Sequence, residues 1–206
     1  ELHEEQGSNE FSVGDIYLGK VRKVVPSLNA SFVDVGYEKD AFLHYLDLGP
    51  QYSSLNKFSR DTLRGKQNVS DLQYFKMEQD IPKDGKITEI VSSSAPILVQ
   101  VAKEPISSKG PRLTAEITLA GRFLVLVPFS NKISISQKIK DQDERDRFKD
   151  IMKAIKPKNF GVIIRTVAET KKLELLEQDL KNLVEKWKKM HANLLNAKPP
   201  YRVLGE

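Results

Sequence analysis

The chain has 206 residues and a formal net charge of +5, with 33 Lys and Arg against 28 Asp and Glu and no Cys. The absence of cysteine excludes disulfides, thiolate metal sites and cysteine nucleophiles within this sequence. Hydrophobic residues make up 39%, which is typical of a soluble globular protein, and no apolar run reaches the roughly 20 residues of a membrane span. The length favours two domains, and the basic excess favours polyanionic partners.

The first part of the chain predicts short strands. Apolar residues recur between turn sequences and indicate strands near 15–25, 30–35 and 40–45. The polar sequence over 48–84, with its scattered aromatic residues, is interpreted as an irregular insertion that holds a single helical turn.

Two further strands are predicted near 86–91 and 96–101, on either side of the serine run at 92–94. Five short strands with one long connection after the third are the layout of an OB-type barrel, a Greek-key fold suited to oligonucleotides. We therefore expect an OB-type barrel in the first half of the chain.

The second half predicts a separate α+β domain. The run LTAEITLAGRFLVLVP (113–128) indicates a second sheet, a helix is expected over 141–156, and GVIIRTVAET (161–170) begins as a strand. A long helix of some 25 residues follows, because apolar residues alternate spacings of three and four. Its stripe is interpreted as a buried face, with a coiled-coil seam as the alternative; the residues are Leu173, Leu176, Leu180, Leu183, Trp187, Met190 and Leu194.

Two phenylalanines fall on the polar faces of predicted strands. Side chains alternate across a strand, so in ASFVDV (30–35) the valines share one face and Phe32 shares the other with Asp34. The same alternation in DAFLH (40–44) places Phe42 between polar neighbours. On the wet face of a barrel such a pair would stack unpaired bases. The alternative is that both rings pack at the end of the barrel or under the insertion.

Cations for backbone phosphates are available nearby. Lys20 and Arg22 share a face of the first strand, and Lys109 and Arg112 flank a glycine in a loop. The alternative for each is an ordinary solvated side chain.

An arginine and a threonine end the strand in GVIIRT. Arg165 shares a strand face with Ile163, at the margin of an apolar surface. Its planar fork can bind a phosphate or a carboxylate through two parallel hydrogen bonds, and Thr166 can add a hydroxyl or an amide if the strand ends there. The alternative is an internal salt bridge between Arg165 and an acid.

No complete active site is evident from the sequence. His3, His44 and His191 lie far apart, without metal-ligand spacing. The phosphate-binding loop, nucleophile elbow and zinc-helix motifs do not occur.

Three segments in this order closely resemble the ribonuclease E/G family of bacterial endoribonucleases, nearer its shorter ribonuclease G type. They are GDIYLGKVRKVVPSLNASFVDVGYEKDAFLH (14–44), SSKGPRLTAEITLAGRFLVLVP (107–128), and FGVIIRT (160–166) followed by a helix with a central tryptophan. The resemblance extends over nearly the whole chain apart from 48–84.

The resemblance implies a domain order. Residues 1–10 would be the remnant of a ribonuclease H-like subdomain, 11–115 an S1-type RNA-binding domain with its insertion at 48–84, and 116–200 a 5′ sensor. Residues 201–206 would begin the next subdomain. The catalytic subdomain, which in the family binds Mg²⁺ and Zn²⁺, would lie outside this sequence, so we expect no metal and no catalytic residue here.

The resemblance also assigns roles by motif. Arg165 and Thr166 match the pair that grips the 5′-monophosphate of RNA, and Gly121 and Val125 match positions that line that pocket. The glycine is expected to bring backbone close to the nucleotide. Phe32, Phe42 and Lys109 match the S1 residues that hold the single strand. Two departures are the cation at Arg122 and the long insertion.

The expected function is therefore the RNA-binding part of a hydrolytic, single-strand-specific endoribonuclease for rRNA processing and mRNA decay. Its partner would be single-stranded RNA with a 5′-monophosphate, and the full-length protein would be a cytoplasmic homo-oligomer. One alternative is a non-catalytic S1-type RNA-binding protein without 5′-end recognition. Another is an oligomerisation module built on the long helix.

Overall fold

The computed structural model describes residues 10–205, and these form two compact units of an α+β fold. Within the described residues, the first unit comprises 10–68, 78–117 and 190–205, and the second comprises 69–77 and 118–189. None of the helices in this part of the chain combines the length and apolar composition that a membrane-spanning helix requires.

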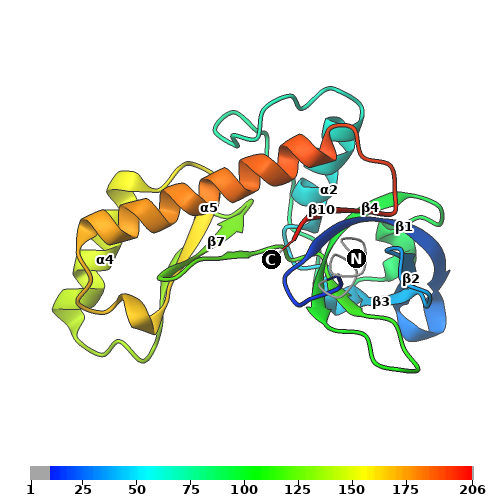
Figure 1. Cartoon of the computed structure of the whole chain (residues 1–206), viewed down its shortest axis with the longest axis horizontal. Coiled ribbons are helices and arrows are strands. Elements are labelled where there is room, and N and C mark those ends of the chain that lie inside the picture. Colours follow the sequence, from blue (N-terminus) through cyan, green and yellow to red (C-terminus); the bar gives the residue numbers. More distant parts are fainter. Residues whose placement is uncertain (1–9, 206) are drawn as a thin grey trace, which may run out of the picture. The chain divides into compact units, whose positions relative to one another are not determined.

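The first unit is a closed barrel of five strands, whose curl Figure 1 shows. Its strands follow the order β1-β2-β3-β5-β4, and β1 also pairs with β4, which closes the ring. The strands are β1 (Ile16–Val25), β2 (Ala30–Asp34), β3 (Ala41–His44), β4 (Pro96–Lys103) and β5 (Arg112–Thr114). Alternate side chains of β2 and β3 are buried, among them Val33 and Leu43, whereas β1 and β4 are buried on both faces along residues 16–19 and 97–101. The predicted barrel is confirmed.

The predicted strand at 86–91 is wrong. This segment contains the short helix α3 (Ile87–Ile90), and the fifth barrel strand is β5. The amide of Ile87 donates to the Asn29 side-chain oxygen at 2.7 Å instead of to a neighbouring strand. A short apolar run such as KITEIV fits a strand and a helical turn equally well, so its tertiary hydrogen bonds decide.

The interpretation of 48–84 as irregular is also wrong in part. It holds α2 (Tyr52–Leu63), a helix of 12 residues whose buried side chains include Tyr52, Leu55 and Phe58 at helical spacing. Short 3₁₀ turns frame the β2 and β3 strands, at Pro26–Leu28 and Tyr45–Asp47.

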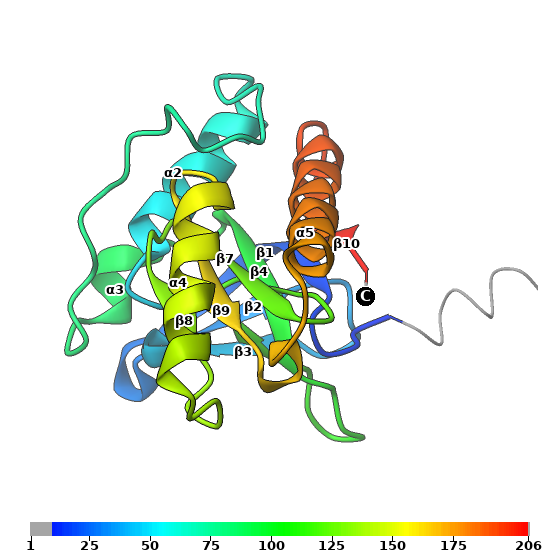
Figure 2. The same cartoon turned by 90° about the vertical axis from the view of Figure 1, so that its left-hand side faces the viewer.

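The second unit is built on a four-stranded sheet in the order β6-β7-β9-β8. Figure 2 shows α4 beside β8. The elements are β6 (Leu119–Ala120), β7 (Leu124–Pro128), β8 (Ile133–Ile135), α4 (Gln142–Ile155), β9 (Phe160–Ile164), the 3₁₀ turn Thr166–Ala168 and α5 (Leu173–Leu194). The second sheet and both helices are confirmed.

The helix α5 is drawn in orange in Figure 1. Its apolar stripe is a buried face, as predicted. The stripe begins at Leu176, because Leu173 is 40% exposed. Trp187 is its centre in the second unit: the rings of Phe129 and Phe160 meet it edge-on at 5.9 Å, and its indole N–H donates to the Ser70 carbonyl at 2.8 Å. Residues 190–194 of the helix belong to the first unit.

The last described residues add a strand. Residues 201–206 were expected to begin another subdomain, and Tyr201–Leu204 forms β10, which pairs antiparallel with β1.

Asn29 ties the turn before β2 to the segment before α3. Its side-chain amide donates to the Gly85 carbonyl at 3.1 Å while its oxygen accepts from Ile87, and its backbone is left-handed with φ of 49°. We predict that Asn29→Gly, which keeps this backbone conformation, lowers the barrel's free energy of unfolding by about 1–3 kcal/mol through the two lost bonds. Asn29→Ala should lower it further, because Ala disfavours the left-handed region.

The measurement is amide hydrogen exchange in β1 to β4, since Trp187 fluorescence reports the second unit. A Gly variant that exchanges like the parent chain would show that neither bond stabilises the barrel.

Candidate nucleic-acid interface

Phe32 and Phe42 lie side by side on the outer face of the barrel. They are cross-strand partners in β2 and β3, their ring centroids are 5.7 Å apart at 66°, and both side chains are half-buried. The intervening positions Val33 and Leu43 are fully buried. The predicted division of faces is therefore confirmed, and the rings line an open cavity instead of packing beneath the insertion.

This cavity of about 790 Å³ brings together four of the six RNA-binding residues predicted in the barrel, namely Phe32, Phe42, Lys109 and Arg112. Three further lysines line it, Lys23, Lys39 and Lys103, together with the acids Asp40 and Glu104. The aromatic pair is therefore surrounded mainly by cations, the combination that accommodates stacked bases and their phosphates.

Lys23 is a cavity residue that sequence reasoning missed. Its Nζ lies 5.1 Å from the centroid of the Phe32 ring, within the range of a cation–π contact. Strict alternation from Lys20 would put Lys23 on the opposite face, but a bulge between Val21 and Lys23 shifts the register and pairs Lys23 with Phe32. A bulge of this kind leaves no mark in the apolar pattern.

Lys20 and Arg22 are outside the set that lines the cavity. Lys20 is the cross-strand partner of Asp34. The Arg22 guanidinium pairs with the carboxylates of Asp34 at 3.2 Å and Asp40 at 3.3 Å, although 59% of the side chain is exposed. Its charge is thus partly offset within the protein.

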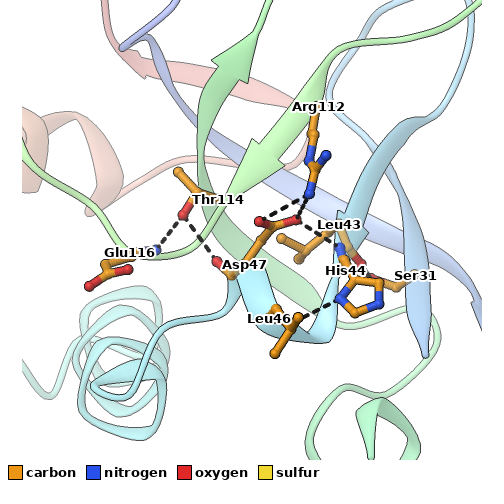
Figure 3. A network of polar contacts seen from close by, with 8 residues as sticks. All are labelled: Ser31, Leu43, His44, Leu46, Asp47, Arg112, Thr114 and Glu116. Carbon is orange, nitrogen blue, oxygen red and sulfur yellow. Dashed lines mark hydrogen bonds and ion pairs between the residues drawn. The ribbon is translucent and has the colours of Figure 1, made fainter. Parts of the chain in front are cut away.

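Arg112 lines the cavity but is held by Asp47, as Figure 3 shows. The Asp47 carboxylate accepts from Arg112 at 3.2 Å and from the His44 amide, while the Asp47 carbonyl accepts from the Thr114 hydroxyl at 3.0 Å. The network joins the turn after β3 to β5 and so fixes the wall of the cavity.

A second group of candidates lies in the second unit, around Arg165. The Arg165 Nη1 donates to the carbonyls of Gly121 at 2.7 Å and Arg122 at 3.2 Å. Two of the five guanidinium N–H groups are thereby used, and the edge formed by Nε and Nη2 remains. Within residues 10–205 no carboxylate pairs with Arg165, and the side chain is exposed. The internal salt bridge considered from the sequence is absent among these residues.

Thr166 is the first residue of the 3₁₀ turn that follows β9. Its hydroxyl shares a hydrogen bond of 2.6 Å with that of Ser136, at the end of β8. The strand therefore ends at this point, which is the condition under which Arg165 and Thr166 can serve one anion. Ser136 was missed, because the contact joins residues 30 positions apart.

Val125 lies opposite Ile163 on neighbouring strands β7 and β9, and Ile163 is 38% exposed. Ile163 precedes Arg165 by two positions and so shares its face. An apolar surface thus adjoins the guanidinium, as the sequence predicted.

Asp179 of α5 organises the turn that holds Arg165. Its buried carboxylate accepts from the amides of Arg122 at 3.1 Å, Phe123 at 2.9 Å and Leu124 at 2.9 Å. A Cβ on Gly121 would lie 2.6 Å from the nearer carboxylate oxygen. The missing side chain therefore makes room for Asp179, which no local sequence signal reveals.

A carboxylate also fixes the turn after Thr166. Glu144 accepts from the Thr170 amide, and its hydrogen bond from Arg147, together with that amide, holds the Glu144 pKa below its ordinary value. The segment after β9 is thus anchored to α4.

Within residues 10–205, no group of three or more His, Cys, Asp or Glu side chains is arranged to hold a metal ion.

Comparison with known proteins gives matches that include both units. Residues 118–206 match the profile described as Ribonuclease E/G family. Over 194 residues, 94% of this chain, the sequence is 36% identical to Ribonuclease E of Nostoc sp., of which it covers 24%. It is 38% identical to the Ribonuclease E/G-like protein of Pyropia yezoensis over 92% of this chain and 32% of that protein.

Ribonuclease G of Salmonella typhimurium is 34% identical over the whole chain, which spans 38% of that protein. The chain therefore covers about a quarter to two fifths of the length of these relatives. The match to the ribonuclease E/G family profile thus lies over residues 118–206, and the identities of 34–38% to ribonucleases E and G and an E/G-like protein include the barrel and the Arg165 segment alike.

Proposed function

We propose that this chain is the RNA-recognition part of a single-strand-specific endoribonuclease that senses the 5′-monophosphate of its substrate. The observation that carries the proposal is the Arg165 guanidinium, which is anchored by two carbonyls on one edge and has no carboxylate partner among the described residues. The relatives' names support ribonuclease activity in the whole protein.

The barrel cavity would bind the body of the strand. Bases stack on the half-exposed rings of Phe32 and Phe42, and Lys39, Lys103 and Lys109 neutralise the phosphates between them. Duplex RNA keeps its base faces stacked inside the helix, so a stacking platform favours unpaired strands.

The Arg165 site would bind the end of the strand. The Nε–Nη2 edge offers two parallel donors to a phosphate, which a 5′-hydroxyl cannot match. The hydroxyl of Thr166 adds a donor once it turns from Ser136, and Val125 with Ile163 offers an apolar contact to the first nucleotide.

We further propose that hydrolysis, with its metal ions, belongs to parts of the protein beyond this sequence, which covers no more than 38% of the relatives compared above. The cytoplasm and a homo-oligomeric state are proposed on the same resemblance. The second candidate, an S1-type RNA-binding protein without 5′-end recognition, is favoured by the cavity alone and would ignore the 5′ group.

The parent chain should bind 5′-phosphorylated RNA about tenfold to a hundredfold more tightly than 5′-hydroxyl RNA, the difference in affinity expected from charge-assisted bonds to one phosphate. Arg165→Ala should abolish this preference. Fluorescence anisotropy with two otherwise identical oligoribonucleotides at one salt concentration measures it. Arg64→Ala, which removes the same charge from the exposed end of α2, is the matched control and should weaken both oligonucleotides equally. Equal binding of both by the parent chain would leave only the second candidate.

Phe32→Ala and Phe42→Ala should each weaken binding of single-stranded RNA by about 1–3 kcal/mol, because each removes a stacking surface. The melting temperature should change little, since both rings lie on the outer face of the barrel and outside its core. Tyr74→Ala removes an aromatic ring that is 91% exposed and outside the cavity, and should leave affinity unchanged. A large loss of stability in both Phe variants would mean that the rings support the core.

The purified chain should leave single-stranded RNA intact in the presence of Mg²⁺, since the described residues offer no group of ligands for the ion. Gel analysis of a labelled oligonucleotide tests this, with the Arg165→Ala chain prepared in parallel to reveal any contaminating nuclease. Cleavage by this chain, at a rate that follows its own concentration through purification, would overturn the assignment.

A further inference from the structure

The turn at 121–124 lies between a buried carboxylate and an exposed guanidinium. Asp179 accepts from the amides of Arg122 and Phe123, and Arg165 donates to the carbonyls of Gly121 and Arg122. These amides and carbonyls are the two ends of the same two peptide units, Gly121–Arg122 and Arg122–Phe123. We call these units the peptide bridge.

Planarity of the peptide makes the bridge rigid. In a trans peptide the N–H and the C=O point in opposite directions, so a unit whose N–H is directed at Asp179 directs its C=O away from it. In both units that carbonyl meets Nη1 of Arg165, at 2.7 Å and 3.2 Å. The carboxylate and the guanidinium therefore hold opposite ends of the same two peptide units.

The charges favour the same arrangement. Each peptide carries a dipole of about 3.5 D, and here the positive N–H ends face the carboxylate while the negative C=O ends face the guanidinium. The peptide dipoles thus favour a carboxylate on one side of the bridge and a guanidinium on the other. A direct salt bridge would instead occupy the edge that two parallel bonds to a phosphate need.

We propose that Asp179 is a positioning residue that acts through the peptide bridge to hold the Nε–Nη2 edge of Arg165 ready for the 5′-phosphate. The inference rests on the function proposed above and deepens it. Gly121 belongs to the same device, because a Cβ there would lie 2.6 Å from one Asp179 carboxylate oxygen and 2.7 Å from the other.

The first test is a double-mutant cycle with Asp179→Asn and Arg165→Ala in the 206-residue chain. The amide of Asn offers one acceptor and a donor that opposes the backbone N–H groups, so the bridge loses its anchor. Asp179→Asn should reduce the preference for 5′-phosphorylated RNA about tenfold, and should leave affinity for the 5′-hydroxyl oligonucleotide unchanged. In the Arg165→Ala background it should have no further effect on the preference.

Gly121→Ala provides a second variant if Asp179→Asn unfolds. Its matched control is Gly161→Ala in β9, where a Cβ would be similarly crowded, 2.9 Å from the Ser130 hydroxyl, but away from the bridge. Gly121→Ala should lower the preference for 5′-phosphorylated RNA. Gly161→Ala should keep this preference even where it lowers the stability of the chain.

A readout without RNA separates this inference from the proposed function. In the parent chain the Arg165 side-chain N–H signals should be resolved by NMR, and amide exchange at 122–124 should be slow; both features should be lost in Asp179→Asn. If the parent chain shows no 5′-phosphate preference, the proposed function fails and these signals still decide the positioning. If Asp179→Asn folds and leaves the Arg165 signals or the preference unchanged, the inference is overturned.

Discussion

The buried carboxylate of Asp179 is the constraint on which the second unit's candidate phosphate site depends. It satisfies three consecutive amides that would otherwise be left without partners as β6 turns into β7. α5 carries this carboxylate beside its buried stripe. The packing of α5 and the conformation of the turn at 121–124 therefore depend on each other. The guanidinium of Arg165 in turn donates to two carbonyls of this turn.

In the barrel, two aromatic side chains lie on the outer face of closely packed strands. An aromatic surface must stay exposed while the strands beneath it stay closely packed, and alternation along β2 and β3 separates the two requirements. The cations around Phe32 and Phe42 come from three different parts of the chain, β1, the turn before β3 and the segment around β4 and β5. Asp47 then fixes Arg112 so that one of these cations is an element of the wall.

Features that depend on residues close together in the sequence could be predicted, and features that depend on distant residues could not. The faces of Phe32 and Phe42, the helix α4 and the stripe of α5 depend on neighbours one to four residues away, and they were predicted correctly. The strand expected at 86–91 was wrong because the amide of Ile87 donates to the side chain of Asn29, 58 positions earlier, and not to a neighbouring strand. Lys23 was not predicted to line the cavity because a bulge breaks the alternation of side chains. The partners of Arg165 were not predicted because they are backbone carbonyls, which no side-chain pattern indicates.

The ammonium group of Lys23 above the Phe32 ring has a consequence for the exposed surface of the barrel. Bare aromatic surfaces attract other apolar surfaces and invite aggregation. A hydrated cation over the ring keeps water beside this surface, at an attraction of about 0.5–1 kcal/mol. On the outer face of the barrel, Lys23 therefore counters the association that a bare pair of rings would favour.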